Sequence, residues 1–424
     1  MHTFTVNSGK PLWYNVITNK IEAWSPEKED VRCPIVTFLP SPSIVYNKIP
    51  MFVIEMTQQC NLRCEYCCYS GNYRDLHSHS EKEISYSTLN DVVHFIEKHT
   101  DKSAESISVC FYGGEALLAR DKISWAINAL TDIFGDRIEF SISTNGVLLT
   151  EPIVDWICSN NNIIVNVSID GNQEMHDRYR KSINGTGSYN TIIRNLELFK
   201  RKYPERYEKG VRFLTTTHSW NSVEELSRVW DEESVLRGHY PVIISHVSPN
   251  FADPTRVYDS FQTKDSFYCA AFEHYKHGKQ DIMTHCFERL VHIVKKRKYN
   301  RLTKKMYLST CFQELFSCYI NVNGDLYACE RCCDSLSVGN VATGFSEDKI
   351  RALINSYIER KNKYCSSCWA QRMCRMCITG LNYTDDEMSQ MCNRERDTIE
   401  LALKYFCELK FWERENKQSI QQSV

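Results

Sequence analysis

Short apolar runs alternate with amphipathic stretches between residues 50 and 260, and this alternation is the main structural signal of the chain. Such runs are typical of buried strands, while stretches 88–99 and 121–134 carry apolar residues at helical spacing. The expected strands are 51–56, 106–112, 138–143, 163–169, 211–216 and 241–245. Repeated strand–helix units predict a parallel sheet with functional side chains at the carboxyl ends of its strands. About six units fit, so we predict an α/β fold with a partial (β/α)6 barrel, similar to a TIM barrel.

The flanking segments follow other patterns. Residues 12–17 and 18–24 form two short runs around an Asn-containing turn, which predicts a β-hairpin, and Pro40 to Pro42 has the composition of a linker. The stretch from 255 to 310 has helical character, and a helix of mixed charge is expected from Asn393 to Glu415. We predict an N-terminal hairpin extension (1–48), a barrel (49–260), a helical bridge (261–310), a cysteine-rich module (311–392) and a C-terminal helix (393–424).

Composition narrows the class of protein. The chain has 424 residues, enough for roughly two or three domains. Its net charge of −2 gives no reason to expect a nucleic acid as partner. We expect no membrane partner and a cytoplasmic location, because no apolar run could span a bilayer and no secretion signal is evident. The 20 cysteines cluster mainly at 60–68 and 311–392, which is typical of metal or redox chemistry rather than a disulfide framework.

Cys60, Cys64 and Cys67 follow the first expected strand with the spacing C-x3-C-x2-C. Three thiolates at this spacing can hold three irons of a [4Fe–4S] cluster and leave the fourth iron open to a substrate. The motif, with the aromatic Tyr66 before its third cysteine, resembles the signature of the radical S-adenosylmethionine (radical SAM) superfamily. A zinc knuckle or an incomplete ferredoxin loop is the alternative interpretation of the triplet.

The resemblance implies that S-adenosylmethionine (SAM) binds at the open iron. Gly113, Gly114 and Glu115 follow the second strand and resemble the GGE motif of the family, although a helix-initiating turn would look the same. Arg180 lies in a segment that resembles peptide-modifying members, and its guanidinium could pair with the methionine carboxylate; a surface charge is the alternative. Other expected contacts to the cofactor are Ser168 and Asp170, with Ser143 and Asn145 as polar lining.

The C-terminal cysteines resemble the SPASM module, which carries auxiliary iron–sulfur clusters in many radical SAM enzymes. The resemblance implies one [4Fe–4S] cluster on Cys311, Cys318, Cys329 and Cys377, and another on Cys365, Cys368, Cys374 and Cys392. Together with the SAM-binding cluster, this gives three clusters. The final pair, Cys374 and Cys377, is separated by two residues where the family usually has three, so the role of Cys377 is open. Cys332 and Cys333 are either spare buried thiols or alternative ligands, and a pair of zinc sites is the alternative for the whole module.

Relatives with this layout modify peptides or proteins through a 5′-deoxyadenosyl radical that abstracts hydrogen. We expect a maturase that forms a thioether from cysteine sulfur to carbon in a ribosomally made peptide. The 1–48 segment resembles a shortened element that binds the leader of such a precursor by strand addition. The alternatives are a sulfatase maturase that generates formylglycine, with Glu330 as its base, and a non-catalytic zinc or iron–sulfur interaction protein. A low-potential donor such as flavodoxin or ferredoxin would supply the electron.

Overall fold

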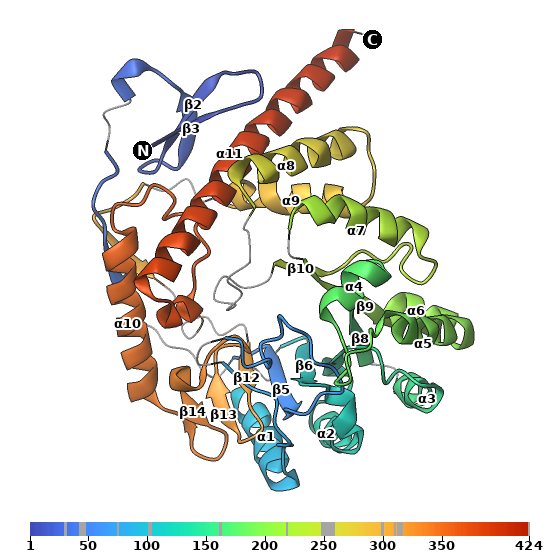
Figure 1. Ribbon diagram of the computed structural model, residues 1–424. Coiled ribbons are helices and arrows are strands. Elements are labelled where there is room, and N and C mark those ends of the chain that lie inside the picture. The colour runs from blue at the N-terminus through green and yellow to red at the C-terminus, as the bar shows by residue number, and fades with distance from the viewer. Residues whose placement is uncertain are drawn as a thin grey trace. The chain divides into compact units, whose positions relative to one another are not determined.

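The computed structural model describes residues 1–28, 32–41, 48–73, 76–100, 104–160, 163–217, 219–246, 259–297, 301–308, 311 and 317–422 (Figure 1). The chain forms two compact units. The sheet unit comprises Pro42–Arg256 and Ser309–Ile354, and the helical unit comprises Met1–Ser41, Val257–Leu308 and Asn355–Val424. No described helix has both the length and the apolar character that crossing a membrane requires.

Six parallel strands form the centre of the sheet unit, in the spatial order β10-β9-β8-β7-β6-β5. The strands are β5 (Met51–Thr57), β6 (Ile107–Gly113), β7 (Ile138–Thr144), β8 (Ile163–Ser168), β9 (Val211–Thr217) and β10 (Ile243–His246). Neighbouring strands follow each other in the sequence, as repeated βα units require. The predicted α/β fold with a parallel sheet is therefore confirmed.

Helices connect these strands and lie along the outer side of the sheet (Figure 1). They are α1 (Tyr86–His99), η2 (Ala116–Ala119), α2 (Arg120–Phe134), η3 (Gly135–Arg137), α3 (Glu151–Ser159), α4 (Gln173–Tyr179), α5 (Tyr189–Lys202), α6 (Pro204–Gly210) and α7 (Asn221–Glu232). Strand β7 illustrates how the sheet is buried. Ile138, Phe140 and Ile142 are buried, whereas Ser141 and Ser143 alternate with them on the opposite face. The apolar face therefore packs in the core, and small polar side chains line the other face.

The sheet continues beyond β5 with strands from the cysteine-rich segment. Strand β12 (Cys318–Ile320) pairs in parallel with β5, and β13 (Asp325–Tyr327), β14 (Gly339–Asn340) and β15 (Gly344–Phe345) follow in antiparallel pairs. The short helix η4 (Asp334–Leu336) connects β13 to β14. This extension of the sheet was not predicted from the sequence.

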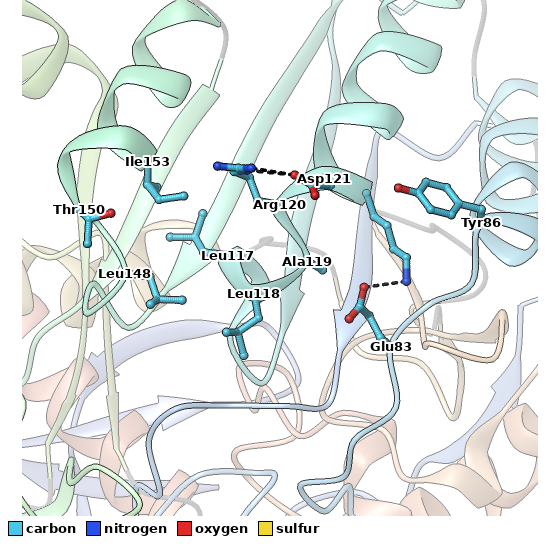
Figure 2. A pocket seen from close by; sticks show the side chains of 11 residues that line it. Glu83, Tyr86, Leu117, Leu118, Ala119, Arg120, Asp121, Leu148, Thr150 and Ile153 are labelled. Carbon is cyan, nitrogen blue, oxygen red and sulfur yellow. Dashed lines mark hydrogen bonds and ion pairs between the residues drawn. The ribbon is translucent and has the colours of Figure 1, made fainter.

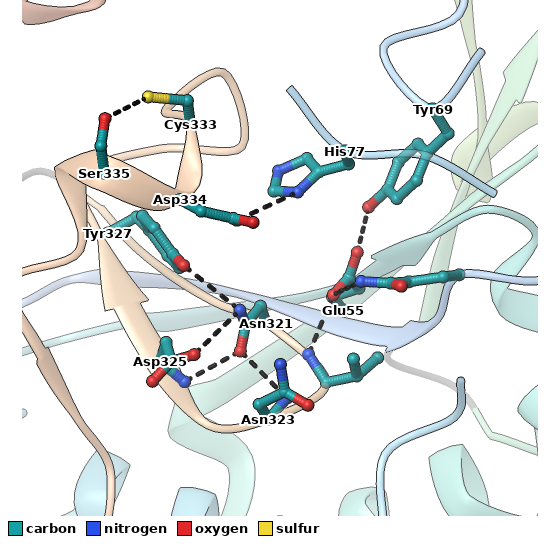
Figure 3. A network of polar contacts seen from close by, with 12 residues as sticks. Glu55, Tyr69, His77, Asn321, Asn323, Asp325, Tyr327, Cys333, Asp334 and Ser335 are labelled. Carbon is teal, nitrogen blue, oxygen red and sulfur yellow. Dashed lines mark hydrogen bonds and ion pairs between the residues drawn. The ribbon is translucent and has the colours of Figure 1, made fainter. Parts of the chain in front are cut away.

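A buried carboxylate joins β5 to the extension. Glu55 is fully buried, and its two oxygens accept hydrogen bonds from the Tyr69 hydroxyl at 2.5 Å and the Val322 backbone N–H at 2.9 Å (Figure 3). Tyr69 belongs to the loop after β5, and Val322 follows β12. Glu55 therefore ties together one strand, the loop that leaves it and the neighbouring hairpin.

The helical unit contains a small antiparallel sheet and long helices. Strands β1 (His2–Thr5), β2 (Pro11–Asn15) and β3 (Lys20–Ala23) form the sheet, so the predicted hairpin has a third strand. Strand β4 (Thr37–Pro40) pairs in parallel with β11 (Lys305–Leu308), which places Pro40 in a strand rather than a linker; Pro42 lies outside the described residues. The other elements are η1 (Pro26–Lys28), α8 (Phe261–Lys276), α9 (Ile282–Lys295), η5 (Ile378–Asn382) and α11 (Asp385–Gln422), while α10 (Glu347–Cys365) belongs to both units.

The N-terminal sheet is integrated into the helical unit. Tyr14 is fully buried and lies edge-on to Trp369, with 6.4 Å between ring centroids. Arg372 donates hydrogen bonds to the carbonyls of Val16 and Ile17, at 3.1 and 3.2 Å. Trp13 is also buried. These contacts make the sheet part of the core of this unit.

Candidate active site

The cysteine loop leaves the carboxyl end of β5 and carries Cys60, Cys64 and Cys67. Backbone N–H groups point at two of the sulfurs: Leu62 donates to Cys60 Sγ and Tyr69 donates to Cys67 Sγ, both at 3.4 Å. Such donors stabilise negative charge on sulfur and are a common feature of iron–sulfur sites. The local backbone therefore favours cysteine thiolates.

Burial of the cysteine side chains has the opposite effect, because it disfavours the charged thiolate form. It raises the pKa of Cys60 to about 12 and the pKa of Cys64 to about 11, although the Arg180 charge lowers the latter. The hydrogen bond between the Cys67 and Cys68 thiols raises the pKa of Cys67. Buried thiols become thiolates when a positively charged group replaces their protons, as a bound cluster does. The three cysteines therefore fit an iron–sulfur cluster. Within the described residues, no three His, Cys, Asp or Glu side chains are grouped as they would be around a single metal ion.

Gly113 and Gly114 allow β6 to end against the cysteine loop. Gly113 has a φ of +140°, and a Cβ there would lie 2.2 Å from the Thr57 carbonyl oxygen. A Cβ on Gly114 would lie 2.2 Å from the carbonyl oxygen of Gln59, the residue before Cys60. Only glycine avoids these clashes. The backbone N–H of Gly114 donates to the Thr57 carbonyl at 2.8 Å, which fixes this close approach.

Glu115 joins the ends of two strands. Its side chain is 1% exposed and accepts hydrogen bonds from Leu117 N–H (3.1 Å), Thr144 Oγ1 (2.8 Å) and Asn145 N–H (2.8 Å). Burial raises the pKa of Glu115, and these three donors oppose the shift. A carboxylate offers about four acceptor positions, so most of its capacity is used within the protein.

Asn145 contacts the cysteine loop directly. Its Nδ2 donates to Asn61 Oδ1 at 2.7 Å and lies 3.7 Å from Cys60 Sγ. Ser143, two residues earlier, faces the polar side of the sheet, where its Oγ lies 3.6 Å from Cys110 Sγ. The ends of β6 and β7 therefore bring three predicted residues, Glu115, Ser143 and Asn145, to the same region as the first cysteine.

A second group of predicted residues surrounds Arg180. Its Nη1 donates to the Tyr66 hydroxyl at 2.8 Å and lies 3.8 Å from Asp170 Oδ2, which accepts a short hydrogen bond from that hydroxyl. Arg180 is 8% exposed, and its Nε is buried with no partner among the described residues. Burial raises the pKa of Asp170, and the Arg180 charge opposes this. Ser168 ends β8 nearby in sequence. An unpaired, buried guanidinium N–H fits a ligand carboxylate such as that of SAM.

His176 holds this segment in place, and its role was not predicted from the sequence. The Asp170 backbone N–H donates to His176 Nδ1 at 3.2 Å, and His176 Nε2 lies 2.9 Å from Ser188 Oγ. Burial lowers the pKa of His176 well below its usual value, so the imidazole is neutral. Asp177 accepts hydrogen bonds from the backbone N–H groups of Ser188 and Tyr189, at 2.8 and 2.9 Å. The only signal in the sequence was the position of these residues beside Arg180.

Glu330 lies on the polar side of the same sheet. Its charge raises the pKa of the Tyr112 hydroxyl and the Cys110 thiol, after larger contributions from Cys68 and from burial respectively. Its Oε1 lies 3.8 Å from Arg331 Nε, and the side chain is half-buried. Glu330 is therefore near Cys68 and Tyr112, beside the cysteine loop.

The predicted auxiliary ligands belong to both units. In the helical unit, burial raises the pKa of the Cys365, Cys374 and Cys392 thiols, and neighbouring cysteines of the set, including Cys368, add to the shift. These four thiols therefore lie within electrostatic range of one another. Cys377, also in this unit, is exposed with its Sγ 3.0 Å from Thr379 Oγ1. In the sheet unit Cys311 is exposed, Cys329 is half-buried and Cys318 is fully buried in β12.

An open pocket of about 440 Å³ lies beside the ends of β6 and β7 (Figure 2). Leu117, Leu118, Arg120, Leu148, Thr150 and Ile153 are among the residues that line it. None of the predicted site residues lines this pocket. The chemistry described above is therefore located elsewhere in the sheet unit.

Comparison with known proteins supports this assignment. Residues 54–228 match the model of the Radical SAM superfamily. A cysteine-type anaerobic sulfatase-maturating enzyme of Clostridium novyi (strain NT) is 30% identical over 187 residues, which cover 43% of this chain and 47% of the relative. The match thus spans about half the length of that relative. A cysteine-type anaerobic sulfatase-maturating enzyme of Clostridium perfringens (strain 13 / Type A) is 22% identical over 82% of this chain and 90% of its own.

A solved structure extends the similarity in fold. Native anSMEcpe with bound AdoMet and Cp18Cys peptide has a TM-score of 0.60 and 18% sequence identity, covering 85% of this chain and 98% of that chain. At this identity the likeness concerns the fold. The family match includes the cysteine loop and the ends of the strands where the predicted residues gather. Residues 54–228 of the chain therefore form a radical SAM domain, which implies a [4Fe–4S] cluster and SAM.

Proposed function

We propose that the protein is a radical SAM maturase that abstracts hydrogen from a ribosomally made peptide and forms a thioether between a cysteine sulfur and carbon. The observation that carries the proposal is the combination, in one chain, of the Cys60–Cys67 loop beside a buried Arg180 and a second set of four cysteines in the helical unit whose thiols influence one another electrostatically. Relatives named as sulfatase-maturating enzymes support a peptide substrate.

Each group of residues has a distinct role in this proposal. Cys60, Cys64 and Cys67 would hold the SAM-binding cluster, and Arg180, oriented by Tyr66 and Asp170, would bind the methionine carboxylate. When bound, the cluster and SAM supply the 5′-deoxyadenosyl radical. Glu115 and Asn145 hold the strand ends against the cysteine loop, which keeps the site in one geometry.

Cys365, Cys368, Cys374 and Cys392 fit a four-cysteine auxiliary cluster that would accept an electron from the substrate. Lys361 is buried beside them, and its charge lowers the pKa of the Cys365, Cys374 and Cys392 thiols. A fixed ammonium group would favour the anionic, thiolate-bound state of such a cluster. A flavodoxin or ferredoxin is proposed as the donor to the SAM-binding cluster.

A leader peptide is proposed to bind at the N-terminal sheet. Strand β3 is at one end of the order β1-β2-β3, so an extended segment could add beside it through main-chain hydrogen bonds. Because Tyr14 and Trp13 are buried in the helical unit, deletion of residues 1–48 would disturb folding as well as binding. Substitutions within β3, such as Ile21→Pro at a half-buried position, are therefore the better probe.

Formylglycine formation is the second candidate, and the position of Glu330 favours it. The carboxylate directly follows Cys329 and lies near Tyr112 on the polar side of the sheet, where it could take a proton from a substrate cysteine or serine. In this reaction the substrate carbon is oxidised to an aldehyde. A thioether keeps the sulfur in the peptide, whereas formylglycine made from cysteine loses it.

The test uses full-length protein, reconstituted and assayed anaerobically with SAM, dithionite and the cysteine-containing peptides encoded beside its gene. We expect release of 5′-deoxyadenosine and a peptide that has lost two hydrogen atoms, retains its sulfur and no longer reacts with iodoacetamide. An aldehyde that reacts with hydrazide, absent in Glu330→Gln but present in the exposed control Glu347→Gln, would replace the thioether by the second candidate. Absence of 5′-deoxyadenosine under all conditions would contradict both.

A further inference from the structure

Cys318 lies on the face of the sheet that is covered by helices. It pairs with Phe52 across the parallel β12–β5 ladder, and neighbours in such a ladder share a face of the sheet. Phe52 packs edge-on against Phe95 of α1, with 6.4 Å between centroids, so this is the face covered by helices. The Cys318 thiol is 0% exposed, and its polar contacts are with backbone groups, those of Tyr319 (carbonyl at 3.8 Å) and Tyr327.

Tyr319, the next residue of β12, has its side chain on the opposite face of the sheet. The Tyr319 hydroxyl lies 3.2 Å from the hydroxyl of Tyr69, which belongs to the cysteine loop. Tyr319 pairs directly with Tyr327 in β13, and directly opposed residues share a face. Cys329 follows Tyr327 by two positions, and the Ser317 hydroxyl continues the hairpin by donating to the Ala328 carbonyl at 3.2 Å. Glu330, which follows Cys329, lies near Cys68 and Tyr112. Cys329 and Cys318 are therefore on opposite faces.

The thiol that lies beside Cys329 is that of Cys332, not that of Cys318. The Cys332 backbone N–H donates to the Cys329 carbonyl at 3.1 Å, which closes a turn. This turn brings the two sulfur atoms to 3.9 Å from each other. The pair has the C-x2-C spacing by which two thiolates from one turn reach the same metal centre. Cys333 differs, because its Sγ lies 2.9 Å from Ser335 Oγ in the following turn.

A buried histidine next to this turn is a second sign of a ligand. His77 is 6% exposed, and its imidazole lies between Tyr69 and Asp334 (Figure 3). Its Nδ1 is 3.8 Å from Asp334 Oδ1, while its Nε2 is buried without a partner among the described residues. Asp334 is two residues after Cys332. A buried ring nitrogen without a partner is unfavourable unless a bound group satisfies it.

We propose that Cys332, and not Cys318, is a ligand of the auxiliary iron–sulfur cluster that includes Cys329, and that His77 covers this cluster with a hydrogen bond. Cys318 is a core residue of the sheet. In the sheet unit, the ligands Cys329 and Cys332 thus come from one turn, and Cys318 of β12 is not among the ligands. This assignment concerns metal binding and does not depend on which peptide the enzyme modifies.

The experiment compares three matched variants in a background that lacks the SAM-binding cluster, Cys60→Ala/Cys64→Ala/Cys67→Ala. Cys318, Cys332 and Cys333 are each 0% exposed, so Cys318→Ala, Cys332→Ala and Cys333→Ala remove equally buried thiols. Iron, zinc and acid-labile sulfide are measured per full-length chain after anaerobic reconstitution. The reduced protein is examined by electron paramagnetic resonance, and circular dichroism reports folding.

We expect Cys332→Ala to lose about half of the auxiliary iron and sulfide and one of two overlapping signals. Cys318→Ala and Cys333→Ala should retain both. Loss of iron in Cys318→Ala with full retention in Cys332→Ala would overturn the proposal. So would equal losses in all three variants, no loss in any of them, zinc in place of iron, or a background protein without iron. If Cys332→Ala does not fold, Cys332→Ser replaces it, and the same iron loss is required.

Discussion

Replacing Glu115 by glutamine should loosen the strand ends that meet the cysteine loop. The carboxylate accepts three buried hydrogen bonds, from Leu117 N–H, Thr144 Oγ1 and Asn145 N–H. Glutamine keeps one oxygen acceptor and places an NH2 group opposite at least one of these donors. Leaving a buried donor unsatisfied costs about 1–3 kcal/mol, and bonds to a neutral oxygen are weaker by about 1 kcal/mol than bonds to a charged one.

The energetic cost of these weakened hydrogen bonds is partly offset, because glutamine also removes a buried negative charge. Burial of that charge is unfavourable, as the raised pKa of Glu115 indicates. We expect a net loss of about 2–4 kcal/mol in local opening free energy. Since 1.4 kcal/mol is a factor of ten, protection from hydrogen exchange should fall by roughly 30-fold to 1,000-fold. The loss should be confined to peptides that contain residues 113–117 and 144–147.

Hydrogen–deuterium exchange with mass spectrometry measures this locally, which avoids treating two units as one unfolding transition. Glu139→Gln is the matched control, because Glu139 is an exposed residue of β7, the strand that ends at Thr144. It should change protection by less than about 0.5 kcal/mol. Unchanged exchange in Glu115→Gln, or an equal change in Glu139→Gln, would refute the reasoning. Weaker SAM binding without a change in exchange would mean that Glu115 acts on the cofactor alone.

Three further predictions concern other parts of the protein. Arg180→Lys should weaken SAM binding by about tenfold or more in equilibrium dialysis, because a lysine lacks the second donor and the planar fork of arginine. The control Arg178→Lys, at an exposed position, should leave SAM binding unchanged. Equal SAM affinities of the two variants would contradict a contact between Arg180 and the methionine carboxylate. His176 has a lowered pKa in the folded state, so below about pH 6.5 the unfolded chain binds a proton that the folded chain does not. The thermal midpoint of the protein should therefore fall as the pH drops from about 7 to 5.5. The fall should be smaller in His176→Asn, which lacks the titrating group. An identical decline in both proteins would exclude this source. Cys368→Ala should still release 5′-deoxyadenosine yet lose modified peptide, whereas Cys64→Ala should release none; product formation by Cys368→Ala with its iron lost would make the second auxiliary cluster dispensable.

The sequence predicted the central sheet because each of its strands carries a local signal. The runs that became β5 to β9 are six or seven residues long, carry apolar residues at successive or alternate positions, and end in polar residues or glycine at the edge where the site lies. The contacts among those polar residues were not predictable in detail. Glu115 was expected to meet the cofactor, but its partners Thr144 and Asn145 are on another strand, and spacing along the chain does not reveal hydrogen bonds across a sheet.

The strands that extend the sheet beyond β5 have almost no recognisable signal in the amino-acid sequence. Strands β12 and β13 have three residues each, too short for periodicity to distinguish them from a loop. Their cysteines drew attention to metal binding and away from strand pairing. Cys318 shows the consequence: by resemblance it was expected to be a ligand, whereas its register with Phe52 places it on the helix-covered face. Which face a cysteine occupies depends on register, and register depends on distant residues.

The pairing of β12 with β5 has a consequence for how the protein is made. During synthesis, β5 and the next strands emerge long before the segment that contains β12. Until that segment arrives, one border of the parallel sheet offers unpaired N–H and C=O groups along an almost entirely buried, apolar strand. Such a border can recruit other chains, and the long sequence separation makes its closure slow. Fragments that end before residue 318 should therefore aggregate, and expression of the radical SAM domain alone should require the β12–β15 segment to cover this border.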